Sequence, residues 1–248
     1  FDSYYHRVYE GFKNQNLTGN ALVEWKYQRY LRDYLSTAAS LDRNIGRTLN
    51  YLDRHNLSNN TIVIYLSDQG FYLGEHGWFD KRFMYEESFR APMVMRYPAV
   101  VKPGTVNNNM IMNLDIAPTL LDAAGVTAPA DMQGISFLPL VSTQKVTGRK
   151  AMYYHYYENG EHSVSPHFGI STGRYKLIRF YKRVESWELF DLHKDPTEMK
   201  NLYGNKKYRK ITMKLKDELL QLIKQYEDLE AEKIFYQDID AENEKVHF

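Results

Sequence analysis

Cysteine is absent from this sequence of 248 residues. Its absence excludes a disulfide framework, a thiolate zinc site and a cysteine nucleophile within these residues. Excess charge is absent too, because 32 Lys and Arg against 31 Asp and Glu leave a net charge of +1. We therefore expect no nucleic acid partner, and any anion binding must be local. No apolar run approaches the roughly 20 residues of a membrane-spanning helix, so no membrane span is predicted.

Helix and strand patterns alternate in the first 140 residues. Apolar side chains recur at helical spacing from residue 31 to residue 52, which predicts a helix with one buried stripe. Residues 61–66 are a continuous β-branched and apolar run, which predicts a strand covered on both faces, like a parallel strand between helix layers. Residues 91–98 predict another short strand, and residues 115–124 a short amphipathic helix closed by Gly125. A helix, a turn and a buried strand make half of an α/β repeat.

The pattern changes near residue 140. Residues 141–150 are polar and suit a linker, and the short aromatic runs beyond them predict an antiparallel sheet. These runs are residues 151–157, 168–172, 175–181 and 187–192. Residues 206–229 place Leu and Ile on one face, which predicts a helix. We therefore expect residues 1–140 to be part of an α/β domain, and residues 141–248 to form a small α+β subdomain with a terminal helix.

The segment directly after the predicted buried strand carries candidate metal ligands. Asp68 and Gln69 come first, and the glycines Gly70, Gly74 and Gly77 follow. Ligands of open α/β sheets bind beyond the carboxyl ends of the strands, and carboxylate and amide oxygens suit Ca²⁺ or Mg²⁺ rather than zinc. The alternative is that Asp68 only caps the next turn. Two donors cannot complete a shell of about six oxygens, so the remaining ligands must come from elsewhere.

Basic residues follow this segment. Lys81 and Arg82 stand 13 and 14 residues after Asp68, and an ammonium group beside a divalent cation could hold an oxyanion. The alternative is a surface ion pair with a nearby acid, for which Asp80, Glu86 and Glu87 are the candidates. His76 could act as a general acid, or it could be a hydrogen-bonded histidine behind the site, which we favour.

Seven segments together resemble the C-terminal half of the formylglycine-dependent sulfatases. They are residues 67–70 (SDQG), 73–77 (LGEHG), 79–82 (FDKR), 85–88 (YEES), 115–121 (DIAPTLL), 173–178 (GRYKLI) and 187–192 (WELFDL). The resemblance extends from about residue 27 to about residue 203, and the order and spacing of the segments make it specific. The sequence looks most like the branch that acts on sulfated glycans, including N-acetylglucosamine-6-sulfatase-like members.

The resemblance implies a fold and a set of roles. The fold is part of an alkaline-phosphatase-like doubly wound sheet followed by a small antiparallel α+β subdomain. Asp68 and Gln69 match the family's calcium ligands, with Ca²⁺ preferred to Mg²⁺, and Lys81 matches the lysine that binds the substrate sulfate. His162 and His167 lie in the downstream region, in what the sequence predicts to be a loop, where either could contact the sugar or simply be solvated. The implied activity is hydrolysis of a sulfate ester on a sulfated carbohydrate, in the periplasm or outside the cell.

One departure from the family pattern bears on activity. The family's nucleophile is a formylglycine made in a Cys/Ser-x-Pro-x-Arg motif, and this chain contains neither that motif nor the second pair of metal-binding aspartates. We therefore expect a C-terminal portion of a longer sulfatase, with its own N-terminal half as partner, and no activity in isolation. The strand at residues 61–66 would then expose apolar surface.

Two other readings of the sequence remain open. Relatives with the same metal-site layout hydrolyse phosphoesters or phosphonates, so that chemistry is an alternative. The missing nucleophile and the 36 aromatic residues also allow a non-catalytic glycan-binding or assembly module.

Overall fold

The computed structural model describes residues 2–142 and 146–244, and the chain divides into two compact units, Phe1–Thr61 and Ile62–Phe248. The first unit is helical, with α1 (Asp2–Lys13), α2 (Gly19–Arg54) and the 3₁₀ turn η1 (Ser58–Asn60). The expected helix at residues 31–52 is confirmed, although α2 begins 12 residues earlier. Phe12 of α1 packs on Trp25 of α2, with ring centroids 4.9 Å apart. The buried stripe expected of this helix is not observed, because no residue of α2 is fully buried among the described residues: Ile45, Leu49 and Leu52 are half-buried and Leu35 is exposed.

The second unit begins with a two-stranded sheet. Strand β1 (Val63–Leu66) pairs antiparallel with β4 (Met93–Arg96), and Tyr65 stands opposite Val94. Both side chains are exposed, Tyr65 by 42% and Val94 by 66%. The prediction of a strand covered on both faces is therefore wrong for this chain: within the described residues β1 pairs only with an antiparallel strand, and Tyr65 leaves one face partly exposed. The apolar surface expected of residues 61–66 is confirmed at Tyr65, while the other five residues are half-buried.

A short hairpin and a one-turn helix connect β1 to β4. They are β2 (Tyr72–Leu73), the turn η2 (Glu75–Gly77), β3 (Phe79–Asp80) and α3 (Glu86–Phe89). The backbone after β1 lies directly against α3, because the Gly70 amide donates to the Ser88 carbonyl at 2.7 Å. A Cβ at position 70 would stand 2.1 Å from the carbonyl oxygen of Glu87, so only glycine fits this contact.

A helical segment follows β4. It contains η3 (Asn113–Asp115), α4 (Ile116–Ala123) and α5 (Leu138–Val141), and Gly125 has the positive φ of 70° expected of a closing glycine. The predicted helix at residues 115–124 is thus confirmed. Asp115 is 1% exposed and accepts hydrogen bonds from Arg149, at 2.6 Å, and from the Ile135 amide, at 2.9 Å. This buried carboxylate ties three stretches of the segment together.

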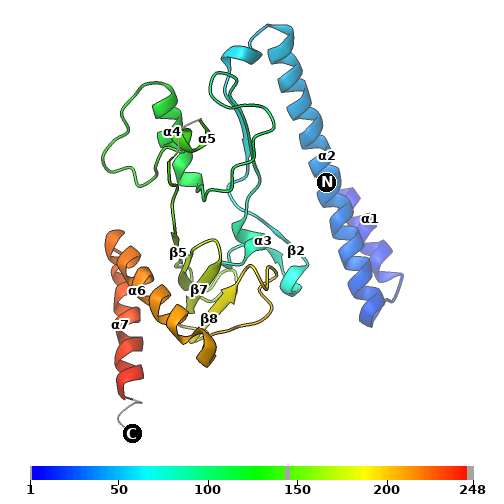
Figure 1. Ribbon diagram of the computed structural model, residues 1–248. Helices are drawn as coiled ribbons and strands as arrows, with labels where there is room; N and C mark the ends of the chain where they lie inside the picture. The colour runs from blue at the N-terminus through cyan, green and yellow to red at the C-terminus, as the bar shows by residue number, and fades with distance from the viewer. Residues whose placement is uncertain (1, 143–145, 245–248) are drawn as a thin grey trace. The chain divides into compact units, whose positions relative to one another are not determined.

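The predicted antiparallel sheet is confirmed and has four strands in sequential order. They are β5 (Met152–Tyr156), β6 (His167–Ser171), β7 (Tyr175–Phe180) and β8 (Ser186–Asp191). One face packs against α6 (Arg209–Gln225) and α7 (Leu229–Glu244), with Phe168 and Ile170 meeting Leu219. The other face meets the segment that carries α3 (Figure 1). Met84 of that segment packs against Ile178.

The terminal helix differs from the prediction. A single helix over residues 206–229 was expected, but the 3₁₀ turn η4 (Lys206–Tyr208) precedes α6, and the chain turns after Gln225 before α7 begins. Glu227 adopts a φ of 55°, and the Asp228 carboxylate accepts from the Ala231 amide at 3.0 Å, so it caps the first turn of α7. A left-handed residue followed by a capping residue ends one helix and starts another.

The structure leaves two predictions about the organisation of the chain untested or only partly covered. Residues 143–145 of the expected linker lie outside the described residues, and the expected domain boundary near residue 140 stays a prediction. The sequence predicted no membrane-spanning helix, and none of the helices described here is long and apolar enough to cross a bilayer.

Candidate functional site

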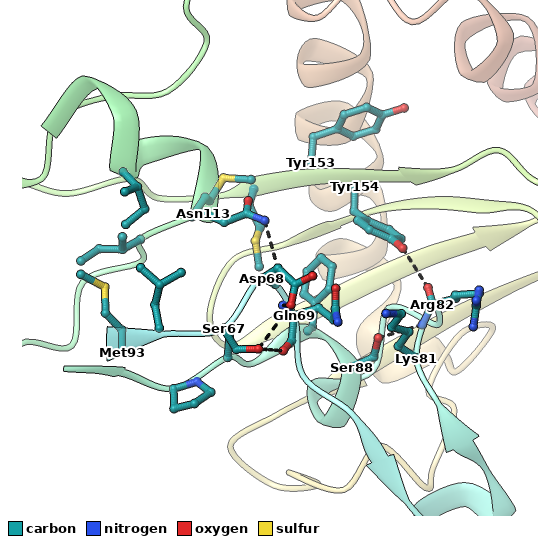
Figure 2. Close-up of a pocket in the computed structure, with 18 residues that line it drawn as sticks. Ser67, Asp68, Gln69, Lys81, Arg82, Ser88, Met93, Asn113, Tyr153 and Tyr154 are labelled. Carbon is teal, nitrogen blue, oxygen red and sulfur yellow. Dashed lines mark hydrogen bonds between the residues drawn. The ribbon is translucent and has the colours of Figure 1, made fainter. Parts of the chain in front are cut away.

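A pocket of about 400 Å³ lies in the second unit, where β1 ends and β4 begins. Six stretches of the chain contribute to its wall: the end of β1 with the turn after it, the loop after β3, α3, the start of β4, residues 111–116 and β5. Asp68, Gln69 and Lys81, which the sequence singled out, all line it (Figure 2). The other lining residues include Ser67, Arg82, Ser88, Phe89, Met93, Asn113, Tyr153 and Tyr154.

The turn after β1 is held by its own polar groups. The Asp68 Oδ1 accepts from the Gln69 amide at 3.1 Å, and the Ser67 hydroxyl donates to the Gln69 carbonyl at 2.8 Å. The Asn113 side-chain amide donates to the Asp68 carbonyl at 3.1 Å and so links this turn to η3. Asp68 therefore does cap its turn, as the alternative interpretation held, and it also lines the pocket. Its second carboxylate oxygen makes no hydrogen bond among the described residues and is left for a ligand.

Lys81 is the cation of this pocket without a partner among the described residues. None of the three acids that could have paired with it does so among the described residues. Asp80 pairs with Arg82, Glu86 pairs with Lys176 at 2.8 Å, and the Glu87 carboxylate lies 3.4 Å from the His76 Nε2 without a hydrogen bond. The surface ion pair therefore holds for Arg82 and not for Lys81, whose ammonium is available for an anion.

His76 lies behind the pocket wall and does not line it. Its Nε2 is 3.4 Å from the Glu87 carboxylate, and its ring stacks on Tyr85 with centroids 4.8 Å apart. The side chain is 12% exposed. This environment favours a supporting histidine over a general acid, and a catalytic part for His76 stays a prediction.

His167 does not lie in a loop, as the sequence suggested, but on β6. It is 0% exposed, so it has no surface to offer a sugar, and the prediction of such a contact is wrong for this structure. Its Nδ1 donates to the Ser165 carbonyl at 2.9 Å, and the ring packs on Phe83 and Phe180. Burial lowers the pKa of His167 to about 4, with the Ser165 carbonyl opposing that shift. The histidine is therefore neutral at physiological pH.

His162 lies in the turn after β5, outside the pocket. Its Nδ1 is 2.5 Å from the Glu158 carboxylate, and its side chain is 38% exposed. Glu158 also accepts from Tyr156 and from the Glu161 amide. These hydrogen bonds and that of His162, among which the Tyr156 bond has the largest effect, lower the pKa of Glu158 to about 2. A sugar contact by His162 stays a prediction.

Several lining residues had no signal in the sequence. Tyr154 lies 72 residues after Arg82, yet its hydroxyl donates to the Arg82 carbonyl at 2.9 Å. Burial raises the pKa of Tyr154 to about 12, with the Arg82 charge opposing, so the phenol remains a donor at physiological pH. Such contacts depend on how the sheet packs on α3, and no local pattern encodes them.

Two family models match this chain. The model described as "Sulfatase" matches residues 1–126, and the model described as "N-sulphoglucosamine sulphohydrolase, C-terminal" matches residues 74–225. Both matched regions contain Lys81, and the first also contains Asp68 and Gln69.

Individual proteins show the same likeness. The chain is 49% identical over 232 residues to an N-acetylglucosamine-6-O-sulfatase of Bacteroides thetaiotaomicron, covering 92% of this chain and 42% of that protein. It is 36% identical over 182 residues to an arylsulfatase of Clostridium perfringens, covering 71% of this chain and 36% of that protein. A solved structure in complex with its substrate D-glucosamine-2-N,6-O-disulfate matches with a TM-score of 0.86 at 49% identity, covering 92% of this chain and 47% of that one. The chain thus spans less than half the length of these relatives.

Proposed function

This chain belongs to the sulfatase family, and we propose that the protein containing it hydrolyses sulfate esters on a sulfated glycan. The observation that carries this proposal is the pocket in which Asp68, Gln69 and an unpaired Lys81 meet. The 49% identity to an N-acetylglucosamine-6-O-sulfatase supports a sulfated amino sugar as the substrate.

The residues at the end of β1 fit a calcium ion. Asp68 has a carboxylate oxygen without a hydrogen bond, and Gln69 and Asn113 each add an amide oxygen on the wall of the same pocket. Hard oxygen donors of this kind suit Ca²⁺, and Mg²⁺ is the alternative. They supply fewer oxygens than the six to eight that Ca²⁺ takes, so other parts of the protein would complete the shell. A bound ion would stabilise negative charge on the sulfate oxygens.

Lys81 would bind the sulfate group. Its ammonium has no competing carboxylate among the described residues, so binding an anion breaks no ion pair. Donors directed at oxygens where charge develops stabilise the transition state more than the ground state. The nucleophile would come from a part of the protein outside this chain, because the chain has neither a Cys nor a Ser-x-Pro-x-Arg sequence.

The partner of this chain would be the remainder of the same protein. The cross-strand pair Tyr65 and Val94 offers an exposed apolar face at which further sheet or helix could pack. A periplasmic or secreted location is proposed from family membership.

Activity of the full-length protein tests the proposal. We expect release of sulfate from N-acetylglucosamine-6-sulfate and from an aryl sulfate, and much slower hydrolysis of an aryl phosphate. After chelation, Ca²⁺ should restore more activity than Mg²⁺. Lys81→Ala should lower kcat/KM by about 10²–10³, whereas Lys102→Ala, at an exposed lysine outside the pocket, should leave it unchanged. Equal rates for the Lys81→Ala and wild-type proteins would remove Lys81 from the site, and a preference for the phosphate would reassign the reaction.

A further inference from the structure

The backbone on both sides of Lys81 has an unusual conformation. Asp80 has a φ of 99° and Arg82 a φ of 105°, although neither is glycine. Positive φ values are unfavourable for residues with a Cβ and persist only when the surroundings hold them in place. The direction of Lys81 is therefore set by whatever holds its two neighbours.

Arg82 is held at three points. Its amide donates to the Ser88 hydroxyl at 3.0 Å, and its guanidinium bonds to Asp80. Its carbonyl accepts from the Tyr154 hydroxyl (Figure 2), at 2.9 Å. The first two anchors come from the stretch between β1 and β4. The third comes from β5 of the C-terminal sheet, and the sheet also contacts the next residue of the loop, because the Phe83 ring packs on His167 and Phe180.

Tyr154 is itself well fixed. Its ring meets Phe89 edge-on with centroids 4.9 Å apart and lies 5.7 Å from the buried ring of His167. The Tyr154 phenol is protonated throughout the physiological pH range, as described above, so the hydrogen bond to Arg82 is always available. A rigid ring with a permanent donor is suited to hold a backbone carbonyl in one place.

Lys81 itself has no such anchor. Its ammonium makes no hydrogen bond or ion pair among the described residues, and its four-carbon stem is flexible. The position of the Lys81 backbone and the direction of its Cα–Cβ bond are therefore the main constraints on where the ammonium lies in the pocket.

We propose that Tyr154 is a positioning residue for Lys81: by holding the Arg82 carbonyl, it fixes the loop conformation that directs the ammonium into the pocket. This inference rests on the proposed role of Lys81 in sulfate binding. Without the hydroxyl, the strained loop can relax, and the ammonium spends less time where it would meet the sulfate.

A double-mutant cycle on the full-length protein tests this. Tyr154→Phe removes the hydroxyl and keeps the ring, and it should lower kcat/KM for an aryl sulfate about 3- to 10-fold. In a Lys81→Ala background the same change should alter kcat/KM by less than twofold, because Tyr154 acts through Lys81. Tyr156→Phe is the matched control: it lies two residues further along β5 and donates to Glu158 instead, so kcat/KM should stay within twofold of wild type.

Each other outcome has a definite meaning. Equal effects of Tyr154→Phe in both backgrounds would show a general structural role and overturn the inference, while leaving the proposed function standing. No effect of Lys81→Ala alone would remove Lys81 from the site and overturn the inference, while sulfate release by the wild-type protein would still support the proposed function. If Lys81→Ala activity falls below detection, the cycle is measured with the Kd for inorganic sulfate. If Tyr154→Phe does not fold, Ser88→Ala removes the anchor on the Arg82 amide and should show the same dependence on Lys81.

Discussion

Replacing Gly70 with alanine should open the contact between the turn after β1 and α3. The new Cβ would lie 2.1 Å from the Glu87 carbonyl oxygen and 3.0 Å from the Ser88 carbonyl carbon. Both are backbone atoms, so no side chain can move aside. Overpacking of this kind costs about 1–3 kcal/mol, and the lost bond from the Gly70 amide to the Ser88 carbonyl adds about 0.5–1.5 kcal/mol. We expect local opening to become easier by about 1.5–4.5 kcal/mol, which is the sum of these two effects.

Hydrogen exchange on the full-length protein measures this opening directly. Since about 1.4 kcal/mol is a factor of ten, the Gly70→Ala protein should exchange its position-70 amide about 10- to 1600-fold faster than wild type. Its kcat/KM should also fall, because the same turn carries Asp68 and Gln69. Gly160→Ala is the control, since a Cβ at that position meets nothing within 4 Å. Exchange at position 70 that rises no more than in the control would refute the reasoning.

Two further predictions concern pH and the isolated chain. The pKa of His167 is about 4 in the folded state and about 6.5 in the unfolded state. As the pH falls, the unfolded state therefore binds the proton first, so the free energy of unfolding should decrease between about pH 6.5 and pH 4. His167→Phe should make the free energy of unfolding in urea less dependent on pH over this range, and an unchanged pH dependence would contradict the burial argument. The 248-residue chain alone should show no turnover of an aryl sulfate. It should also self-associate through the exposed apolar face of β1 and β4, and a stable, monodisperse monomer in light scattering would count against this self-association.

The sequence predicted elements well where a local pattern was sufficient. The four strands of the C-terminal sheet and the helix closed by Gly125 follow from short apolar or aromatic runs bounded by turn residues. The division of the last helix had a signal that could have been used, because Asp228 precedes an apolar helical stretch as capping residues do. This capping signal is weak in the sequence, because the preceding helical pattern continues across Asp228.

Pairing and packing were less predictable because they depend on distant residues. The run at residues 61–66 has the composition of a fully covered strand, yet coverage depends on what else is present to pack on it, and here Tyr65 stays exposed. His167 carries no local mark that separates a loop position from a buried one. Its burial follows from rings on three other stretches, including Phe83 and Phe180.

The C-terminal sheet therefore does more for the candidate site than cover one side of it. Lys176 on β7 is 0% exposed and lies 2.8 Å from both Glu86 and Glu198, and the Glu86 amide donates to Glu198 at 2.6 Å. These contacts fix the start of α3, and α3 in turn holds the turn that carries Asp68. Because removing one partner from a buried ion pair leaves an uncompensated charge, this link resists displacement. The metal-ligand candidates are thus tied to the C-terminal sheet through this ion network, and the loop that carries Lys81 is tied to it through the Tyr154 hydroxyl and the Phe83 ring.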